Sequence, residues 1–284
     1  MSAVVVSVSP SIARIVVELR GQMPDRVTLD TLFAVARAYR AKIDGLYIEE
    51  QGLAALADLA CARHVSFAGH CSGASAFAGL ANTLSSAIGA VRRDLERRAK
   101  ADDLQLGFDV VREDPDACLS AHCAKDAIVL LSGGLSVQTA ERLAGLLGGT
   151  SRIIGALLVG PMARVSSAAI IAVASDLRSL ERVVRTALRL QDASPEPIRL
   201  VLAGSTREDL AALAAAAERL IPPEAAVTLI PARITPGSTA TFVHSLGRIP
   251  GRLMILPVGG VLPASAEVIR ALANGLNRPL LLLK

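Results

Sequence analysis

Aromatic residues are scarce in this sequence. Trp is absent, and aromatic side chains together make up 2% of the 284 residues. Hydrophobic residues nevertheless reach 52%, so the core has to be built from Ala, Leu, Val and Ile. That composition is typical of parallel sheets covered by Ala- and Leu-rich helices. It argues against binding of single-stranded nucleic acid, which relies on aromatic stacking platforms.

Cysteine is also sparse, and four Cys in the whole chain exclude a small scaffold stapled by disulfides. Charged residues are too few, at 20%, for a disordered chain. Neither sign of charge dominates, because 30 Lys and Arg stand against 26 Asp and Glu. The densest basic run, 92–100, carries acids at helical spacing, which indicates a solvated helix face. No nucleic-acid partner is predicted.

Long apolar runs are missing. The longest stretch without a charged side chain, Val65–Val91, is rich in Ser, Gly and Ala, which makes it too polar for a membrane span. Residues 1–6 have no basic region before their apolar stretch, so they do not resemble a secretory signal. The sequence therefore predicts a cytoplasmic protein with reduced thiols and no membrane contact.

The chain contains an internal repeat. Leu130–Leu135 resembles Leu256–Val261, and an offset of 126 residues superposes their Gly-Gly pairs. The same offset carries Thr-Ala-Glu at 139–141 onto Ser-Ala-Glu at 265–267. A match that stays in register through a strand, a turn and a helix start indicates that the two halves are homologous.

The upstream ends of the halves match at a different offset. Arg14–Val17 aligns with Ala169–Ala172, which gives 155 residues. This offset is 29 residues larger than the offset of 126, which predicts an insertion of about that length in the first half, placed at about 51–77. The predicted domains are 1–162 and 163–284.

Each half shows short apolar runs, rich in β-branched residues, that alternate with segments of helical period. The expected strands are 14–19, 43–48, 105–111, 127–131 and 152–159, then 169–174, 198–203, 226–231, 253–257 and 280–283. The expected helices are 28–41, 79–101, 116–125 and 137–147, then 176–191, 207–220, 238–247 and 265–275. Strict alternation predicts an α/β fold with parallel sheets, right-handed crossovers and helices on both faces.

This layout resembles the tandem, two-domain form of the universal stress protein family. The resemblance is carried by a first strand that ends near Glu18, by fourth strands that run into Gly-Gly, and by Ala-Glu at the start of each last helix. It implies two tandem doubly wound five-stranded parallel sheets, flavodoxin-like or adenine-nucleotide-hydrolase-like, with strand order 3-2-1-4-5. It also implies that the last strands pair, which would make the chain an internal pseudo-dimer.

The resemblance further implies a ligand crevice at the carboxyl ends of strands 1 and 4. Nucleotide-binding members of the family carry an Asp after strand 1 and a Gly-x2-Gly-x9-Gly-Ser/Thr loop after strand 4, whose amides hold the triphosphate. Here both Gly-Gly turns lead at once into a helix. The Asp position is taken by Glu18 or Leu19 in the first half and by Ala174 in the second. The candidate ligand-binding residues are Glu18, Gly133, Gly134, Ser136, Asp176, Gly259, Gly260 and Ser265.

The sequence is best interpreted as a non-catalytic stress-response or regulatory protein that acts through partners or a small ligand. Weak or absent ATP binding is predicted, with ATP or AMP as the candidate nucleotides. The alternative is a nucleotide-binding protein or ATPase with an altered crevice. No catalytic residue is assigned, because no nucleophile–base–orienter set, Gly-x-Ser-x-Gly elbow, GxGxxG or P-loop is present. Each Gly-Gly pair also fits a plain strand-to-helix turn.

Thiols and imidazoles gather in the first half: Cys61, His64, His70, Cys71, Cys118, His122 and Cys123. Zinc takes such ligands, but no Cys-x-x-Cys pair is present and buried Cys is common as an apolar filler. No metal ligand is therefore assigned, and a metal or redox sensor remains a third hypothesis. The 51–77 insertion is expected beside the crevice, as a lid, a partner-docking surface or a surface excursion. A homodimer of the whole chain, in addition to the internal pseudo-dimer, is a further hypothesis.

Overall fold

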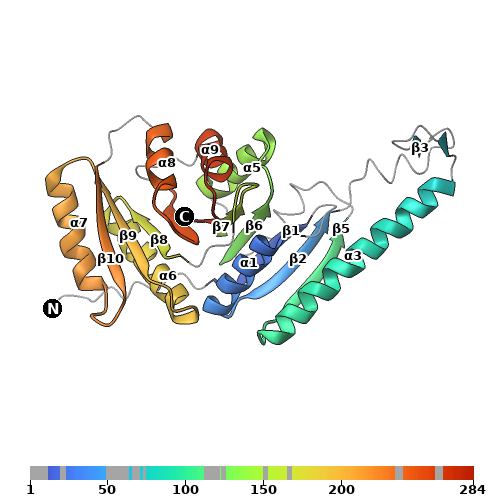
Figure 1. Ribbon diagram of the computed structural model, residues 1–284, viewed down its shortest axis with the longest axis horizontal. Coiled ribbons are helices and arrows are strands. Elements are labelled where there is room, and N and C mark those ends of the chain that lie inside the picture. The colour runs from blue at the N-terminus through green and yellow to red at the C-terminus, as the bar shows by residue number, and fades with distance from the viewer. Residues whose placement is uncertain are drawn as a thin grey trace.

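The fold is described from a computed structural model (Figure 1). The structure describes residues 12–19, 24–48, 64–65, 71–72, 75–111, 122, 126–149, 153–164, 168–233, 239–259 and 265–284.

Strands and helices alternate in both halves. The first half comprises β1 (Arg14–Leu19), α1 (Arg26–Tyr39), β2 (Lys42–Ile48), β3 (His64–Val65), β4 (Cys71–Ser72), α3 (Ser75–Ala101), β5 (Leu106–Val111), β6 (Ala127–Ser132), α5 (Val137–Gly148) and β7 (Ile153–Val159). The second half comprises β8 (Ile170–Ala174), α6 (Leu177–Ala193), β9 (Ile198–Gly204), α7 (Arg207–Leu220), β10 (Val227–Arg233), α8 (Thr239–Gly247), β11 (Leu253–Pro257), α9 (Ala266–Gly275) and β12 (Leu280–Leu283).

The main sheet has ten strands in the order β10-β9-β8-β11-β12-β7-β6-β1-β2-β5. Read outward from its centre, each half has the order 5-4-1-2-3, so the predicted α/β class and strand order are confirmed. The main-sheet pairs within a half are parallel, and β12 pairs with β7 in the antiparallel sense. Because β12 of the second half pairs with β7 of the first, the two five-stranded halves join into one continuous sheet.

The predicted element positions agree closely with the observed ones, with three exceptions. The sequence predicts the helix before the third strand of the first half from residue 79, but α3 begins at Ser75. The expected helix at 116–125 falls outside the described residues except for His122. The short β3–β4 hairpin has no counterpart among the predicted elements.

The inserted segment does not place its described residues over the crevice. The β3–β4 hairpin lies at the N-terminal end of α3, and that end of the helix extends past the edge of the main sheet (Figure 1). The expected position beside the crevice is therefore wrong for these strands. The remaining residues of 51–74 lie outside the described part of the chain.

Two layers of helices cover the sheet. One core cluster joins alternate strand residues such as Ile15 and Ile255 to α1, α3, α6 and α7. The other joins the intervening residues, such as Val16 and Met254, to α5, α8 and α9. This alternation follows from the two-residue period of a strand, whose successive side chains point to opposite faces. Among the described residues, none of the helices has the length and hydropathy required to cross a bilayer.

Side chains cap the N-termini of α1, α5, α6, α7 and α9. Asp25 accepts a hydrogen bond from the Thr28 amide at the start of α1, and Ser136 accepts one from the Thr139 amide at the start of α5. These side chains satisfy amides that have no partner inside the helix. Arg40 ends α1 in the left-handed conformation, with φ of 49°.

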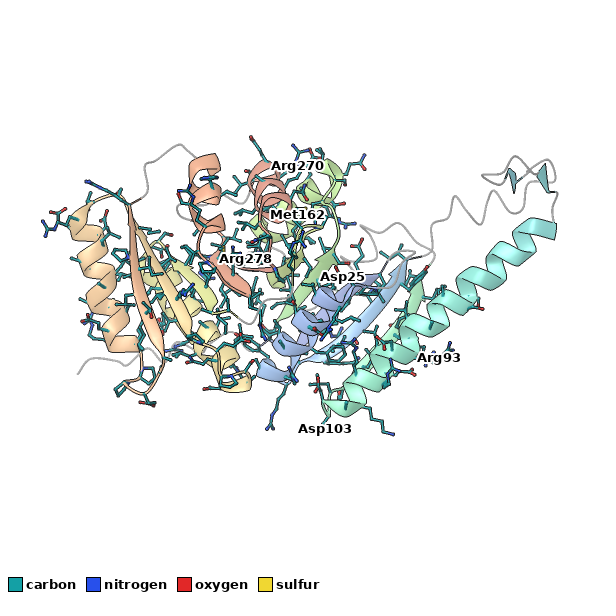
Figure 2. The ribbon with its side chains drawn as sticks, viewed as in Figure 1. Asp25, Arg93, Asp103, Met162, Arg270 and Arg278 are labelled. Carbon is teal, nitrogen blue, oxygen red and sulfur yellow. The ribbon has the colours of Figure 1, made fainter. Side chains whose placement is uncertain are left out.

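Arg278 fixes the C-terminal end of α8 (Figure 2). Its buried guanidinium donates hydrogen bonds to the carbonyl oxygens of Gly247 and Ile249. Carbonyls at a helix C-terminus lack intrahelical partners and carry partial negative charge, so a cation is favourable there. Burial lowers the pKa of Arg278 from its ordinary value.

The two halves meet through three equivalent pairs of elements: β7 with β12, α1 with α6, and α5 with α9. Arg189 of α6 lies over the ring of Tyr39, 4.7 Å from its centroid, and donates to the Ala38 carbonyl at 3.0 Å. Gly155 faces Leu283 where β7 and β12 pair. A Cβ at Gly155 would lie 2.2 Å from the Leu282 carbonyl oxygen, so this close approach requires glycine.

Candidate functional site

A cavity of about 280 Å³ opens at the carboxyl ends of β1 and β6. These neighbouring strands form the switch point of the first half, where the crossovers diverge to the two faces and where such sheets bind ligands. The cavity is at the small end of the range for ligand pockets. Its lining residues are Glu18, Leu19, Pro24, Asp25, Thr28, Leu131, Ser132, Gly133, Gly134, Leu135, Thr139, Gly160 and Pro161.

Glu18 forms a buried ion pair at the wall of this cavity. Its Oε2 accepts a hydrogen bond at 2.9 Å from Nη2 of Arg142, on α5. The Glu18 and Arg142 side chains are only 5% and 10% exposed. The carboxylate at the predicted ligand position is therefore already bound to a cation from the helix that follows the Gly-Gly turn.

The Gly-Gly turn joins β6 to α5 and uses its amides within the protein. Gly133 has φ of +92°, which glycine adopts without strain, and its amide donates to the Val159 carbonyl at 2.9 Å. The Leu135 amide donates to Oδ1 of Asn274, on α9 of the second half, at 3.3 Å. Ser136 caps α5. Two of the amides that could face a phosphate thus already have acceptors.

The charge of the lining does not fit a triphosphate. Among the described residues, the lining includes the carboxylates of Glu18 and Asp25 but no Lys, Arg or His. Hydroxyl groups come from Thr28, Ser132 and Thr139. Figure 2 shows Asp25 at the end of α1 that adjoins the cavity. Phosphate sites normally supply cations or several free amides, so this lining suits a small uncharged ligand that bears hydroxyl groups.

No model of a protein family matches the sequence, and no curated protein matches it. Solved structures do match. A protein from Pseudomonas aeruginosa UCBPP-PA14 assigned to the universal stress proteins aligns with a TM-score of 0.59 and 12% identity, over 97% of this chain and 94% of that chain. A universal stress protein from Archaeoglobus fulgidus DSM 4304 aligns with a TM-score of 0.58 and 11% identity, over 95% and 96%. The chain has a universal stress protein-like fold.

A third match shares the same arrangement. The cytoplasmic domain of a prokaryotic cation chloride cotransporter aligns with a TM-score of 0.55 and 13% identity, over 95% of this chain and 94% of that domain. At these identities the likeness establishes the fold alone.

In the second half of this universal stress protein-like fold, the predicted residues serve as helix caps and turns. Asp176 caps α6 and accepts from the amides of Arg178 and Ser179. Gly259, with φ of +97°, makes the turn after β11, and Ser265 caps α9. Gly260 lies outside the described residues. The structure therefore brings Glu18, Gly133 and Gly134 to one cavity, with Ser136 just beyond it.

The buried ion pair of the first half has an apolar counterpart in the second. The repeat offsets place Val173 where Glu18 stands and Val268 where Arg142 stands. Both valines are buried in the same core cluster. Both charged residues are therefore replaced by valine in the second half, although Glu18 and Arg142 are 124 residues apart in the sequence. The crevices of the two halves have different chemistry.

Hydrogen bonding controls the ionisation of Asp176. Burial alone would raise the pKa of this carboxyl, but hydrogen bonds from Ser179, Arg178 and Ser175 outweigh that effect and hold the pKa below its usual value. A carboxylate whose pKa is lowered by folding stabilises the fold above its unfolded pKa of about 4, and this stabilisation is lost as the pH falls through the folded pKa.

We expect Asp176→Ala to lower the free energy of unfolding by about 1 kcal/mol at neutral pH. The difference from wild type should shrink as the pH falls from about 5 toward about 2. Asp176→Asn is the matched control, because Asn is an equally good cap that does not titrate. Urea unfolding at several pH values measures this. An Ala deficit that stays constant down to the lowest pH would contradict the assigned cap charge.

Sequence reasoning missed Asp25 and Thr28, which line the cavity, and Arg142 and Asn274, which form hydrogen bonds with lining residues. Asp25 had a usable signal, because an Asp after Pro and before an apolar periodic run indicates a helix start. Arg142 and Asn274 had no usable sequence signal, because their partners are 124 and 139 residues away in the sequence.

The thiol and imidazole groups of the first half mostly lie outside the described residues, which include His64, Cys71 and His122. The described part of the chain contains no group of three or more His, Cys, Asp or Glu side chains that could hold a metal ion.

Proposed function

We propose that the chain is a non-catalytic regulatory protein of the universal stress type. In this proposal it binds a small ligand without a triphosphate in the first-half cavity, and its ATP binding is weak or absent. The proposal rests on one observation: polar groups of the site already have partners within the protein. Arg142 binds Glu18, Asn274 binds the Leu135 amide, and the described lining contains no basic side chain.

Physical chemistry supports a binding role for this cavity. Its carboxylates and hydroxyls can accept and donate hydrogen bonds to an uncharged ligand without bringing like charges together. A triphosphate would instead face Glu18 and Asp25 with no cation among the described lining residues. The alternative function, an ATPase with an altered crevice, requires the triphosphate to bind there.

A partner surface at the first-half insertion is part of the same proposal. The end of α3 that bears the β3–β4 hairpin extends beyond the sheet edge, away from the shared interface of the halves (Figure 1). A projecting element of this kind is accessible to a second protein while the cavity is occupied. Ligand binding and partner binding would thus use separate parts of the first half.

Thermal unfolding with adenosine and with ATP tests the ligand proposal. These probes differ by the triphosphate, and a ligand present at 100 times its Kd stabilises the native state by about 2.7 kcal/mol. We expect stabilisation by adenosine and none by millimolar ATP. Gly134→Leu should abolish the effect, because Gly134 lines the cavity and an added Cβ there would meet no described atom within 4 Å, so the larger side chain can be accommodated at the ligand site.

Gly145→Leu is the matched control for this variant. Gly145 lies on the exposed side of α5, where an added Cβ would also meet no described atom within 4 Å, and it does not line the cavity. It should keep the adenosine response. Stabilisation by ATP that Gly134→Leu removes would favour the ATPase, and no response to either probe would contradict a nucleoside-sized ligand.

A further inference from the structure

Among the described strands, β5 and β10 are the two edges of the main sheet, at its opposite ends (Figure 1). The Ile43 amide of β2 donates to the Gln105 carbonyl at 2.9 Å. Successive residues of a strand direct their backbone groups to opposite sides, so Leu106, Phe108 and Val110 direct theirs away from β2. No described group accepts a hydrogen bond from these three amides. β5 therefore presents unpaired backbone groups of the kind that bind a further strand.

The β10 edge, in contrast, is blocked. The Ala226 carbonyl accepts a hydrogen bond from β9, so Val227 and Pro231 direct their backbone groups away from the sheet. Pro231 has no N–H to donate, and the Val227 amide already donates to the Ala225 carbonyl at 2.9 Å. A proline that faces solvent from an edge strand prevents a further strand from pairing there.

Val110 is the first-half counterpart of Pro231. Both stand four positions after the strand residue that pairs with an equivalent isoleucine, which is Ile43 in β2 and Ile198 in β9. The first half thus keeps a donor at the position where the second half has none. The Val110 side chain is also 47% exposed. The described part of α3 packs on a face of the sheet, through residues such as Leu95, and accepts no hydrogen bond from this edge.

We propose that the β5 edge binds a second copy of this chain, with the two β5 strands antiparallel about a two-fold axis at Phe108. Each outward-facing residue then exchanges two backbone hydrogen bonds with the residue opposite. Leu106 of each copy lies opposite Val110 of the other, and the Phe108 side chains lie opposite each other on the same face. Such apolar cross-strand pairs stabilise a sheet. The strands β7 and β12 already join the two halves in this antiparallel way.

The charges on the opposite face of β5 favour a second copy over an unrelated strand. In this register the exposed Asp109 of one copy lies opposite Gly107 of the other, so like charges do not face each other. A Cβ at Gly107 would lie 3.3 Å from Nζ of Lys42, so this ammonium group is next to the incoming carboxylate. Lys42 and Arg14 share the single carboxylate of Asp44, which leaves one positive charge in excess for Asp109.

Sedimentation velocity of the whole chain at a series of protein concentrations tests this inference. We expect wild type to form a dimer, and Val110→Pro, which reproduces the blocked edge of the second half, to raise the Kd of the dimer at least tenfold. Val110→Ile is the matched control, because it keeps the amide and the apolar side chain, and it should remain dimeric. Asp109→Lys should also weaken the dimer, and adding Lys42→Glu should restore it.

Hydrogen exchange of the Val110 amide provides a second readout, which we expect to be slow in the dimer and fast after dilution. A wild-type protein that is monomeric at every concentration would overturn the inference. Protection of this amide in a monomer would do the same, because another segment of the chain would then cover the edge. A dimer that survives both Val110→Pro and Asp109→Lys would show that the copies bind elsewhere. None of these results depends on a ligand in the first-half cavity.

Discussion

Glu18→Val is expected to lower the free energy of unfolding by about 3 kcal/mol, because it leaves a guanidinium charge in a buried site without its carboxylate. Arg142→Val should cost a similar amount for the converse reason. The double variant should lose less than the sum of the two, since no uncompensated charge stays buried. The second half has this apolar pair already, as Val173 and Val268. Urea unfolding of the four proteins measures the coupling.

An exposed ion pair provides the control for this cycle. Arg92 and Glu96 of α3 are joined at 2.7 Å, with side chains 58% and 48% exposed. Solvent screens such a pair, so Glu96→Ala should change stability by less than about 0.5 kcal/mol. If Glu18→Val cost no more than Glu96→Ala, or if the single losses added fully, the buried pair would not have the energetic role assigned to it.

Gly155→Ala is expected to destabilise the protein by about 3 kcal/mol, since overpacking at a site enclosed by backbone cannot be relieved by rotating a side chain. The added Cβ would meet the Leu282 carbonyl oxygen at 2.2 Å and force β7 and β12 apart. These strands are the only sheet contact between the halves among the described strand pairs. The unfolding midpoint should therefore fall for both halves together.

The same substitution at Gly145 should have the opposite sign. Gly145 is exposed within α5 and has no described neighbour within 4 Å of an added Cβ. Replacing a helical Gly by Ala stabilises by about 0.5–1 kcal/mol. The comparison separates the clash at the shared sheet from the general effect of removing glycine. A stabilising Gly155→Ala would mean that β7 and β12 do not pair closely in solution.

The layered fold could be predicted from the sequence because its signals are local. Runs such as Ile170–Ala174 are apolar and β-branched, which favours buried strands, and caps such as Ser136 and Asp176 mark the helix starts. The repeat then added long-range information, since a duplicated unit repeats its topology. The last strands Ile153–Val159 and Leu280–Leu283 are apolar edges of the kind that attract a partner, and in the structure they pair with each other.

The chemistry of the candidate site could be predicted only in part. Glu18 and the Gly-Gly turn were found because they occupy known positions relative to strands 1 and 4. What those groups contact depends on residues far along the chain, and neither Arg142 nor Asn274 carries a motif that identifies its partner. The position of the β3–β4 hairpin was also unpredictable, because nothing in the insertion specifies the direction in which it leaves the sheet.

Calorimetric titration of the wild-type protein with ATP tests the central claim most directly. The claim is that side chains of the protein itself occupy the groups of the first-half crevice that would otherwise bind a triphosphate. We expect no measurable heat of binding at millimolar ATP. Micromolar binding that is lost in Gly134→Leu but kept in Gly145→Leu would place ATP in the cavity and contradict the account.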